Sequence, residues 1–515
     1  MKNSGKGSFC PIVLFVLFFF VLFCDGAHGA LYYVREDGSG DGSSWENALG
    51  EQGFIDTLAA AVAGDEFWIA AGTYRSTTDP GERTASFVLK SGVALYGGFA
   101  GTEIRREDRD WTANVTVFTG EIQGNDEPLD NSFHVLVGNG ALGTAVLDGF
   151  TVTGGYADGP GISSNGGGIC TEHGSPTVAN CTFSGNTAMN AGAGMFNHMG
   201  SPAVTNCTFT ENSSGSIGGG ICNLESGAGF AFCMFDGNSA GEGGGGMYNE
   251  GGSPAVSGCT FSGNSASSGG GMENEESAVS LSNCTFYGNT AFSGAAMYNR
   301  LEPPAVVNCT FYANEADNEG GGIYNSRCDP EVFSCTFMEN GAIGGGGIYN
   351  RESSPVLTNC IFWEDAGGEI VNAAGSVPTA SYCLVQGGYP DGTSILISPP
   401  LLGGLADNGG PTMTCALLTG SPAIDAGTSA GMPSEDQRGI ARPQGRGFDM
   451  GAFEFEISSP SPASTGGGGC SAAEGTAFIS LLFPVLLLAS MRSSTPGGKD
   501  PKGRLIGKKE HNSRG

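Results

Sequence analysis

The sequence has few charged residues, and positive charge is the scarcest kind. Only 14% of the 515 residues are charged, and 52 acidic against 22 basic residues give a formal net charge of -30. No lysine occurs between Lys90 and Lys499, and no arginine occurs between Arg109 and Arg300. A chain of this charge repels phosphate backbones, so we expect no nucleic-acid partner. Cations, basic surfaces and neutral glycans remain compatible.

Recognisable cofactor motifs are also missing. The five histidines are scattered and no Cys-x-x-Cys pair occurs, so the sequence predicts no zinc site and no other cofactor. The glycine runs lead into strand residues instead of a helix, which excludes a phosphate-binding loop. Residues 37–42, Asp-Gly-Ser-Gly-Asp-Gly, offer oxygen donors that could hold calcium, although they lack EF-hand spacing and a simple capping loop is the alternative.

Ninety glycines accompany 39% hydrophobic residues, and a repeat organises both. From about residue 160 the chain repeats Ser-Pro-x-Val-x-Asn-Cys-Thr-Phe-x-x-Asn, followed by Gly-Gly-Gly-Ile/Met-Tyr-Asn. Its cysteine stands at 181, 207, 233, 259, 284, 309, 335 and 360, in steps of 25 or 26 residues. Helical repeats are longer and show a 3.6-residue period, which is absent here.

Each repeat predicts strands that place the same residue types inward. Cys and Phe lie two apart with Thr between them, so they share the inner face of one strand. The residue before Cys is Asn, or Gly258, in most repeats and tolerates a left-handed bend. We therefore predict three short strands per coil, with one sharp bend and two looser turns. The fold is an all-β, right-handed, single-stranded parallel β-helix.

When the coils stack, residues at the same position of successive coils lie next to each other and form ladders. We assign a structural role to Asn ladders that bond their own turns and the next coil, and to a Phe ladder in the core. The assigned ladder residues are Cys181, Phe183, Asn186, Cys207, Phe209, Asn212, Cys259, Phe261, Asn264, Asn249, Asn325 and Asn350. The repeated cysteines face the same way one coil apart, so buried thiols are favoured over disulfides.

The N-terminus has the layout of a secretory signal. Lys2 and Lys6 precede an apolar run from Pro11 to Phe23, and small residues follow. We predict a signal peptide at residues 1–29. Lipoprotein processing at Cys24 is the alternative, although the bulky Phe23 before it fits that signal poorly.

Two resemblances extend this interpretation. The Phe-x-x-Asn and Gly-Gly-x-Ile/Met pairs, as in Phe261 to Asn264 and Gly245 to Met247, resemble repeats of polymorphic outer-membrane proteins and the pectate-lyase-like β-helix superfamily. That resemblance implies N-terminal capping and first coils at residues 30–159 and a repeat β-helix at 160–400. It also implies a surface location, but no autotransporter barrel follows the repeats.

Residues 401–456 are similar to the choice-of-anchor Q domain, through Asp-Asn-Gly-Gly-Pro-Thr at 407–412 and Gly-Ser-Pro-Ala-Ile-Asp-Ala-Gly at 420–427. A Gly/Ser/Pro linker at 457–475, a hydrophobic segment at 476–491 and a basic, cytoplasmic tail at 492–515 resemble a Synerg-CTERM sorting signal. The resemblance implies processing near Gly468 and Gly469 and attachment through Cys470. The hydrophobic segment is short for a stable membrane span.

These features predict an exported protein at the cell surface or outer membrane, or released from it. We expect an adhesin-like or structural binding role, with no catalytic residues and an unidentified surface, glycan or protein ligand. The C-terminus would supply the membrane or envelope association. A secreted polysaccharide lyase or glycoside hydrolase on the same fold is the alternative. Its substrate rim would be Glu250, Glu275, Arg300 and Arg351, for which solvated turns are the simpler explanation.

Overall fold

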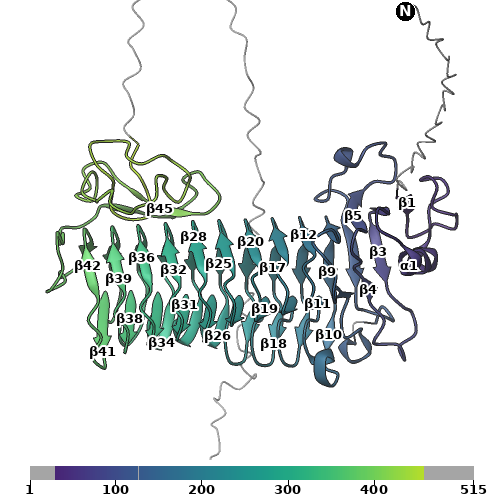
Figure 1. The fold of residues 1–515 in the computed structure, drawn as a ribbon, viewed down its shortest axis with the longest axis horizontal. Helices are drawn as coiled ribbons and strands as arrows, with labels where there is room; N and C mark the ends of the chain where they lie inside the picture. Colours follow the sequence, from purple (N-terminus) through teal and green to yellow (C-terminus); the bar gives the residue numbers. More distant parts are fainter. Residues whose placement is uncertain (1–28, 126, 457–515) are drawn as a thin grey trace, which may run out of the picture. The chain divides into compact units, whose positions relative to one another are not determined.

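The structure is a computed structural model that describes residues 29–125 and 127–456. The linker, the hydrophobic segment, the basic tail and all of the signal segment before Gly29 lie outside the described residues. In the described part, short strands of successive coils stack in parallel along one axis (Figure 1). This confirms the parallel β-helix. No helix among the described residues is both long enough and apolar enough to cross a membrane.

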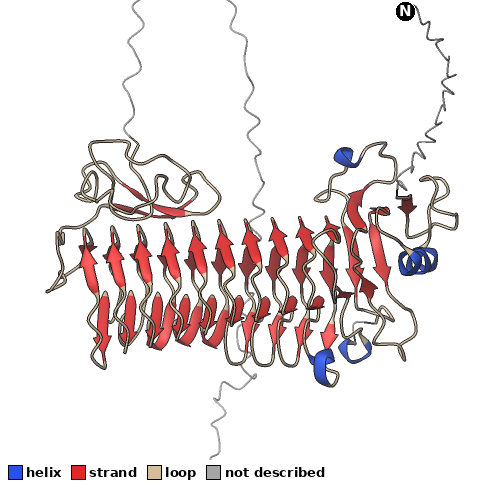
Figure 2. Cartoon of the chain, in the orientation of Figure 1, coloured by secondary structure: helices blue, strands red, loops and turns tan. Residues whose placement is uncertain are grey.

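The coils contribute to four parallel sheets, which we call sheets A to D (Figure 2). Sheet A consists of β1 (Leu31–Val34), β2 (Glu66–Ala70), β5 (Ala94–Phe99), β8 (Val146–Asp148), β12 (Thr177–Ala179), β16 (Ala203–Thr205), β20 (Gly229–Ala231), β24 (Ala255–Ser257), β28 (Ser280–Ser282), β32 (Ala305–Val307), β36 (Glu331–Phe333), β39 (Val356–Thr358) and β42 (Thr379–Ser381). Sheet B consists of β3 (Gly72–Arg75), β6 (Thr116–Thr119), β9 (Thr151–Thr153), β13 (Thr182–Ser184), β17 (Thr208–Thr210), β21 (Met234–Asp236), β25 (Thr260–Ser262), β29 (Thr285–Tyr287), β33 (Thr310–Tyr312), β37 (Thr336–Met338), β40 (Ile361–Trp363) and β43 (Leu384–Val385).

Sheets C and D complete each coil. Sheet C consists of β4 (Phe87–Val88), β7 (Leu136–Val137), β11 (Ile169–Glu172), β15 (Met195–His198), β19 (Ile221–Leu224), β23 (Met247–Glu250), β27 (Met272–Glu275), β31 (Met297–Arg300), β35 (Ile323–Ser326), β38 (Ile348–Arg351) and β41 (Ile370–Ala373). Sheet D consists of β10 (Tyr156–Ala157), β14 (Thr187–Ala188), β18 (Ser213–Ser214), β22 (Ser239–Ala240), β26 (Ser265–Ser268), β30 (Thr290–Ser293) and β34 (Glu315–Glu319).

Sheet D corrects the predicted three strands per coil. Its strands are short. Those from β14 to β26 consist of Ser, Thr and Ala, β30 adds Phe292, and β34 is mostly acidic, so no run of large apolar residues marks them in the sequence. In the coils from β14 to β34, the chain passes from sheet A through B and D to C before it enters the next coil.

The bends between strands are single residues with positive φ. The predicted bend before Cys is confirmed, because it has a φ of 53° at Asn180 and 52° at Asn206. In two repeats the residue before Cys is Phe232 or Ser334 instead of Asn or Gly. Both residues also adopt the left-handed conformation, with φ of 56° and 52°. The two looser turns we expected are wrong, because three more left-handed bends recur in most coils. They are exemplified by Gly185, Gly192 and Met199.

Interior ladders connect the coils. In the first Asn ladder, which runs from Asn186 to Asn340, each side-chain amide donates to the Oδ1 atom of the next amide at 2.9–3.0 Å. The same amide group also donates to a backbone carbonyl, as from Asn212 to Phe183 at 2.9 Å. The last amide, Asn340, donates to the Asp365 carboxyl group at 2.8 Å. From Phe183 to Phe362 the stacked rings have centroids 4.5–5.2 Å apart. Every cysteine that the structure describes is a free, buried thiol.

Helix α1 (Glu51–Ala60) and residues 401–456 lie outside the coils and cover parts of them. Helix α1 buries Phe54 and Leu58, and the Phe54 ring lies 5.5 Å from that of Phe67, at one end of the core (Figure 1). The short 3-10 helices are η1 (Arg106–Asp108), η2 (Pro128–Asp130) and η3 (Gly161–Ser164). Residues 401–456, with the antiparallel pair β44 (Leu402–Ala406) and β45 (Thr414–Leu417), pack on the outer face of sheet B.

A buried glutamine fastens this C-terminal module to sheet B. Gln437 accepts a hydrogen bond from the Thr310 hydroxyl at 2.7 Å and donates to the Thr285 hydroxyl at 2.8 Å. Within the module, Arg438 pairs with Asp436 at 2.8 Å and Arg442 pairs with Glu454 at 3.2 Å, and all four side chains are buried. Each of these buried charged side chains therefore has a partner of opposite charge within the module.

Phe232 tests the role of the left-handed bend. A left-handed conformation costs most residues about 1–2 kcal/mol, and Asn tolerates it better. The Phe232 side chain is 57% exposed, so little burial is lost on replacement. We expect Phe232→Asn to stabilise the protein by about 1 kcal/mol, measured as a higher thermal midpoint. Phe232→Ala keeps the unfavourable conformation and should give no gain; an equal gain from alanine would contradict the account.

Candidate binding surface

The predicted ladder residues lie inside the coils. Their side chains are at most 1% exposed, so a ligand outside the protein cannot contact them. This holds for Cys181, Phe183, Asn186, Cys207, Phe209, Asn212, Cys259, Phe261, Asn264, Asn249, Asn325 and Asn350. The proposed processing residues Gly468, Gly469 and Cys470 lie outside the described residues.

The acidic and basic row suggested as a substrate rim lies at the ends of the sheet C strands. Three of its members, Glu250, Glu275 and Arg300, bond to neighbouring side chains. Arg300 pairs with Glu275 at 3.3 Å, and the Tyr248 hydroxyl donates to Glu250 at 3.2 Å. The structure therefore brings Glu275 and Arg300 together as an ion pair on neighbouring strands.

Beside that row, Glu273 occupies a position that is tyrosine in nearby coils. Tyr248 and Tyr298 flank it in register. The Glu273 carboxyl group is buried under β26, where the Ser268 hydroxyl donates to it at 2.7 Å, and it lies against Gly243. Burial raises the pKa of Glu273 to about 7, and the nearby Glu275 charge adds to the effect.

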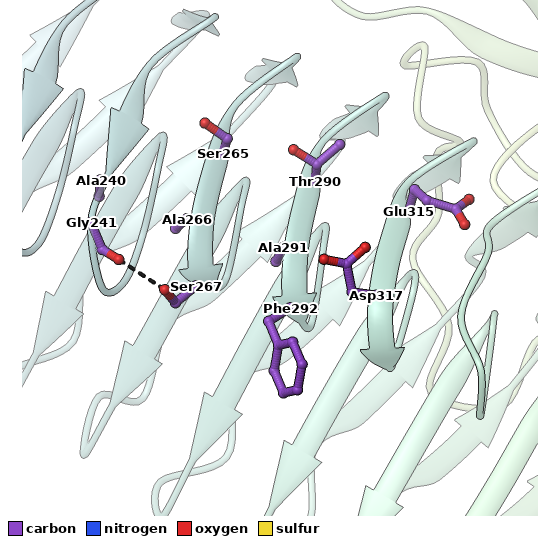
Figure 3. A pocket seen from close by; sticks show the side chains of 10 residues that line it. All are labelled: Ala240, Gly241, Ser265, Ala266, Ser267, Thr290, Ala291, Phe292, Glu315 and Asp317. Atoms are coloured by element: carbon purple, nitrogen blue, oxygen red, sulfur yellow. Dashed lines mark hydrogen bonds between the residues drawn. The ribbon is translucent and has the colours of Figure 1, made fainter. Parts of the chain in front are cut away.

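A groove runs along the outer face of sheet D, across four successive coils (Figure 3). Strands β22, β26, β30 and β34 form it, and its volume is about 440 Å³. The lining residues are Ala240, Gly241, Ser265, Ala266, Ser267, Thr290, Ala291, Phe292, Glu315 and Asp317. The alanines belong to the inward-facing row, whereas the other side chains point outward, because neighbouring residues of a strand alternate.

Phe292 is the aromatic residue of the groove. It is 58% exposed, unlike the stacked phenylalanines of the core. The residues at its position in the two preceding coils are Gly241 and Ser267, which are too small to cover the ring. In Figure 3 the ring projects outward from β30, with open space on the side of Ser267. An exposed aromatic of this kind is a common anchor in binding sites.

The acidic side of the groove comes from β34. The register between β30 and β34 shifts after Ala291, so β34 holds one extra residue beyond Ala316. Such a bulge redirects side chains. In Figure 3 the Asp317 carboxyl group projects toward β30, whereas Glu315 points to the next coil, where Gly341 leaves room for it. The two carboxyl groups therefore do not converge.

The electrostatics of the groove are one-sided. Its lining contains two carboxylates and no lysine or arginine. A polyanionic ligand would meet repulsion at this surface, whereas a neutral ligand rich in hydroxyl groups could donate hydrogen bonds to the carboxylates. The geometry is suited to holding such a ligand, because an apolar ring and hydrogen-bond acceptors lie on neighbouring strands.

Sequence reasoning did not single out this groove. Phe292 falls between the repeat motifs, and its outward direction depends on sheet D, which we did not predict. The sequence did contain one signal: Phe292 follows Gly241 and Ser267 at the same position of successive coils. For metals, no group of three or more potential ligands occurs among the described residues. In the proposed calcium loop, Asp37 pairs with Arg35 at 3.3 Å and Asp41 accepts hydrogen bonds from Ser43.

One comparison with known protein families supports the fold. The family described as "Right handed beta helix region" matches residues 200–381, which confirms the predicted handedness. Among solved structures, the chain is similar to the pectin methylesterase from Aspergillus niger in deglycosylated form. The identity is 12% and the TM-score 0.25, over 63% of this chain and 85% of that chain. Likeness at this level assigns no activity. No curated protein matches the chain.

Glu273 gives a testable pH dependence. Its pKa is raised in the folded protein, so the folded state binds the proton more tightly and stability falls as pH rises from about 4.5 to about 7. Glu273→Gln removes this loss. We expect the variant to match the parent near pH 4.5 and to be more stable at pH 8, by at most about 3 kcal/mol. Thermal midpoints across this range measure the difference.

The exposed Glu302 supplies the matched control for that experiment. Glu302→Gln makes the same change in net charge without removing a buried carboxyl group. It should not reproduce the pH-dependent gain. A gain that is equal at pH 4.5 and pH 8 in Glu273→Gln would show that its carboxyl group is not the cause.

Proposed function

We propose that the protein is an exported, non-catalytic β-helix binding protein that holds a neutral glycan in the groove of sheet D. The exposed Phe292 carries this proposal, because it is an outward aromatic beside acceptors, at a position that is Gly or Ser in the two preceding coils. A sugar ring has an apolar face of C–H groups that suits an aromatic ring. Its hydroxyl groups could donate to Asp317 and exchange hydrogen bonds with Thr290. They could also donate to the Ser267 oxygen, whose own O–H group donates to the Gly241 carbonyl at 2.8 Å.

The direction of the groove supports a chain-like ligand. The four strands that line it are adjacent and in parallel order, so the groove follows the axis along which the coils stack. Neighbouring strands lie about 4.8 Å apart. A glycan along this axis would therefore meet a new coil at intervals comparable to its own sugar units, with Phe292 as its main apolar contact.

Carboxylate geometry favours binding over hydrolysis. Glycosidases place two carboxyl groups on either side of the bond they break. Here Glu315 and Asp317 point in different directions, and Glu275 is engaged by Arg300. A carbohydrate-active enzyme on this fold remains the alternative function, which the fold alone does not distinguish.

The location of the protein is a proposal supported by sequence features alone. The signal at residues 1–29 supports export, and Gly468, Gly469 and Cys470 before a short apolar segment support attachment to the cell envelope. Surface attachment would present the groove to glycans outside the cell.

The groove is tested by binding of neutral hexasaccharides to the purified chain. We would titrate cellohexaose, xylohexaose, mannohexaose and, as the acidic probe, hexagalacturonate, with calorimetry as the measurement. We expect one or more neutral probes to bind, and we expect no binding of the acidic probe that depends on Phe292. Phe292→Ala should weaken that binding at least tenfold, about 1.4 kcal/mol, whereas Phe292→Trp should retain it.

Met189 supplies the matched control. It is an exposed apolar residue that follows β14, at the position of Phe292 in an earlier coil, but it lies outside the groove. Met189→Ala should leave binding unchanged. Shortened or unsaturated sugars in the incubation would establish the enzymatic alternative. Binding of hexagalacturonate alone, or unchanged binding by Phe292→Ala, would refute the groove.

Attachment through Cys470 makes a separate prediction. A Cys470→Ala chain expressed in its native host should shift from the cell fraction to the medium, because the proposed thiol attachment is lost. Immunoblots of both fractions measure the shift. Cys24→Ala, which removes the lipoprotein alternative, should leave the protein on the cell. If Cys470→Ala stays fully surface-bound, the thiol is not the point of attachment.

A further inference from the structure

A second hollow lies on the outer face of sheet B, near the N-terminal end of the coils. Its volume is about 500 Å³, within the range of small-molecule sites. The lining residues are Thr73, Arg75, Thr119, Glu121, Gly124, Pro128, Asn131, Thr153 and Gly154. It shares no residue with the groove of sheet D.

The floor of this hollow is a regular row of side chains. Arg75 on β3 is in register with Thr119 on β6, which is in register with Thr153 on β9. The residues that directly precede these three on their strands point inward. They are Tyr74, Phe118 and Val152, and all are fully buried in the core. The row is thus held outward by a packed sheet, so its geometry is fixed before any ligand arrives.

Arg75 differs from the other arginines of residues 30–159. Arg35, Arg83, Arg105, Arg106 and Arg109 each pair with a carboxylate. No carboxylate of the described residues lies within salt-bridge distance of the Arg75 guanidinium group, although the Glu51 carboxylate accepts a hydrogen bond from the Arg75 backbone N–H group. The Nε atom donates to the Glu121 carbonyl at 3.0 Å, which orients the guanidinium plane, and the two terminal nitrogens make no hydrogen bond within the part of the chain that the structure describes.

The nearest carboxylate of the lining is engaged elsewhere. Glu121 accepts hydrogen bonds from the backbone N–H groups of Gln123 and Gly124, at 3.2 and 2.9 Å. Gly124 has a φ of 68°, and an added Cβ atom would lie 3.7 Å from the Arg75 guanidinium. The Glu121 carboxylate is therefore bound by the backbone of its own loop. The backbone at Gly124 lies close to the Arg75 guanidinium group.

Asn131 adds an unsatisfied acceptor to the wall. The residue is 6% exposed, and its side-chain N–H donates to the Gly154 carbonyl at 2.9 Å. Its Oδ1 atom is buried without a hydrogen-bond partner among the described residues. This oxygen lies behind the surface of the hollow, so contacts with a ligand come from Arg75 and the threonine side chains.

We propose that this hollow binds a small polyhydroxylated ligand that carries one oxyanion, such as an acidic monosaccharide. The oxyanion, a carboxylate or a sulfate ester, would accept two hydrogen bonds from Arg75. Ligand hydroxyl groups would bond to Thr73 and Thr153. A single charge suits the site, because the strongly acidic protein as a whole repels polyanions. The site does not depend on glycan binding by sheet D.

The test is titration of the purified full chain with N-acetylneuraminic acid, glucose 6-sulfate and glucose, observed by saturation-transfer NMR. We expect at least one acidic sugar to bind, with binding weakened by added salt, and glucose to bind at least tenfold more weakly. The carboxylate and sulfate probes distinguish the two oxyanions. Arg75→Gln should reduce binding at least tenfold, and Arg75→Lys should restore only part of it, because lysine lacks the planar fork.

A second variant guards against local misfolding. Thr153→Val removes one hydroxyl group from the row and preserves the β-branched strand residue, so it should weaken binding a few-fold without lowering the thermal midpoint. Phe292→Ala should leave this binding unchanged, which separates the site from the sheet D groove. The proposal is overturned if neither acidic sugar binds, if glucose binds equally well, or if Arg75→Gln binds like the parent.

Discussion

From Asn212 to Asn314, each amide of the first Asn ladder donates to the amide one coil ahead and to a phenylalanine carbonyl one coil back. Because these side chains are fully buried, loss of one partner would leave the neighbouring polar groups unsatisfied, at about 1–3 kcal/mol for each group. This constraint fixes the register of successive coils. At Asp365 the ladder ends on a side chain that accepts from Asn340, and burial with the nearby Glu369 raises its pKa.

A fixed register determines where the outer side chains stand. Thr290 is aligned with Ser265 and Glu315, and Arg75 is aligned with Thr119, because the strands that carry them are held from inside. A residue that departs from the repeat on the outer face therefore appears at a defined place on a rigid surface. Phe292 and Arg75 are such departures, and each belongs to a hollow.

Most of the fold could be predicted from the sequence, because inward positions repeat in both identity and spacing. The Cys, Phe and Asn ladders and the left-handed bend at Asn180 follow from that pattern. Sheet D could not be predicted, since its strands from β14 to β26 contain only Ser, Thr and Ala, and β30 and β34 do not continue any apolar pattern. The bends at Met199 and Glu211 were equally hidden, because these residue types do not favour a positive φ.

The binding surfaces were less predictable than the core for the same reason. Whether Phe292 points outward depends on a strand that the sequence does not reveal. Whether Arg75 has a partner depends on contacts between loops far apart in the chain, as does the pairing of Arg83 with Asp158. The row of Glu250, Glu275 and Arg300 was visible in the sequence, but its members bond to neighbouring side chains.

The most direct test of the proposed binding function is a crystal structure of the protein with the neutral hexasaccharide that it binds best. The account predicts an intact glycan along sheet D, with one sugar ring over Phe292 and a hydroxyl group bonded to Asp317. A glycan bound at the Glu275 and Arg300 edge of sheet C, or a cleaved product at any site, would contradict it.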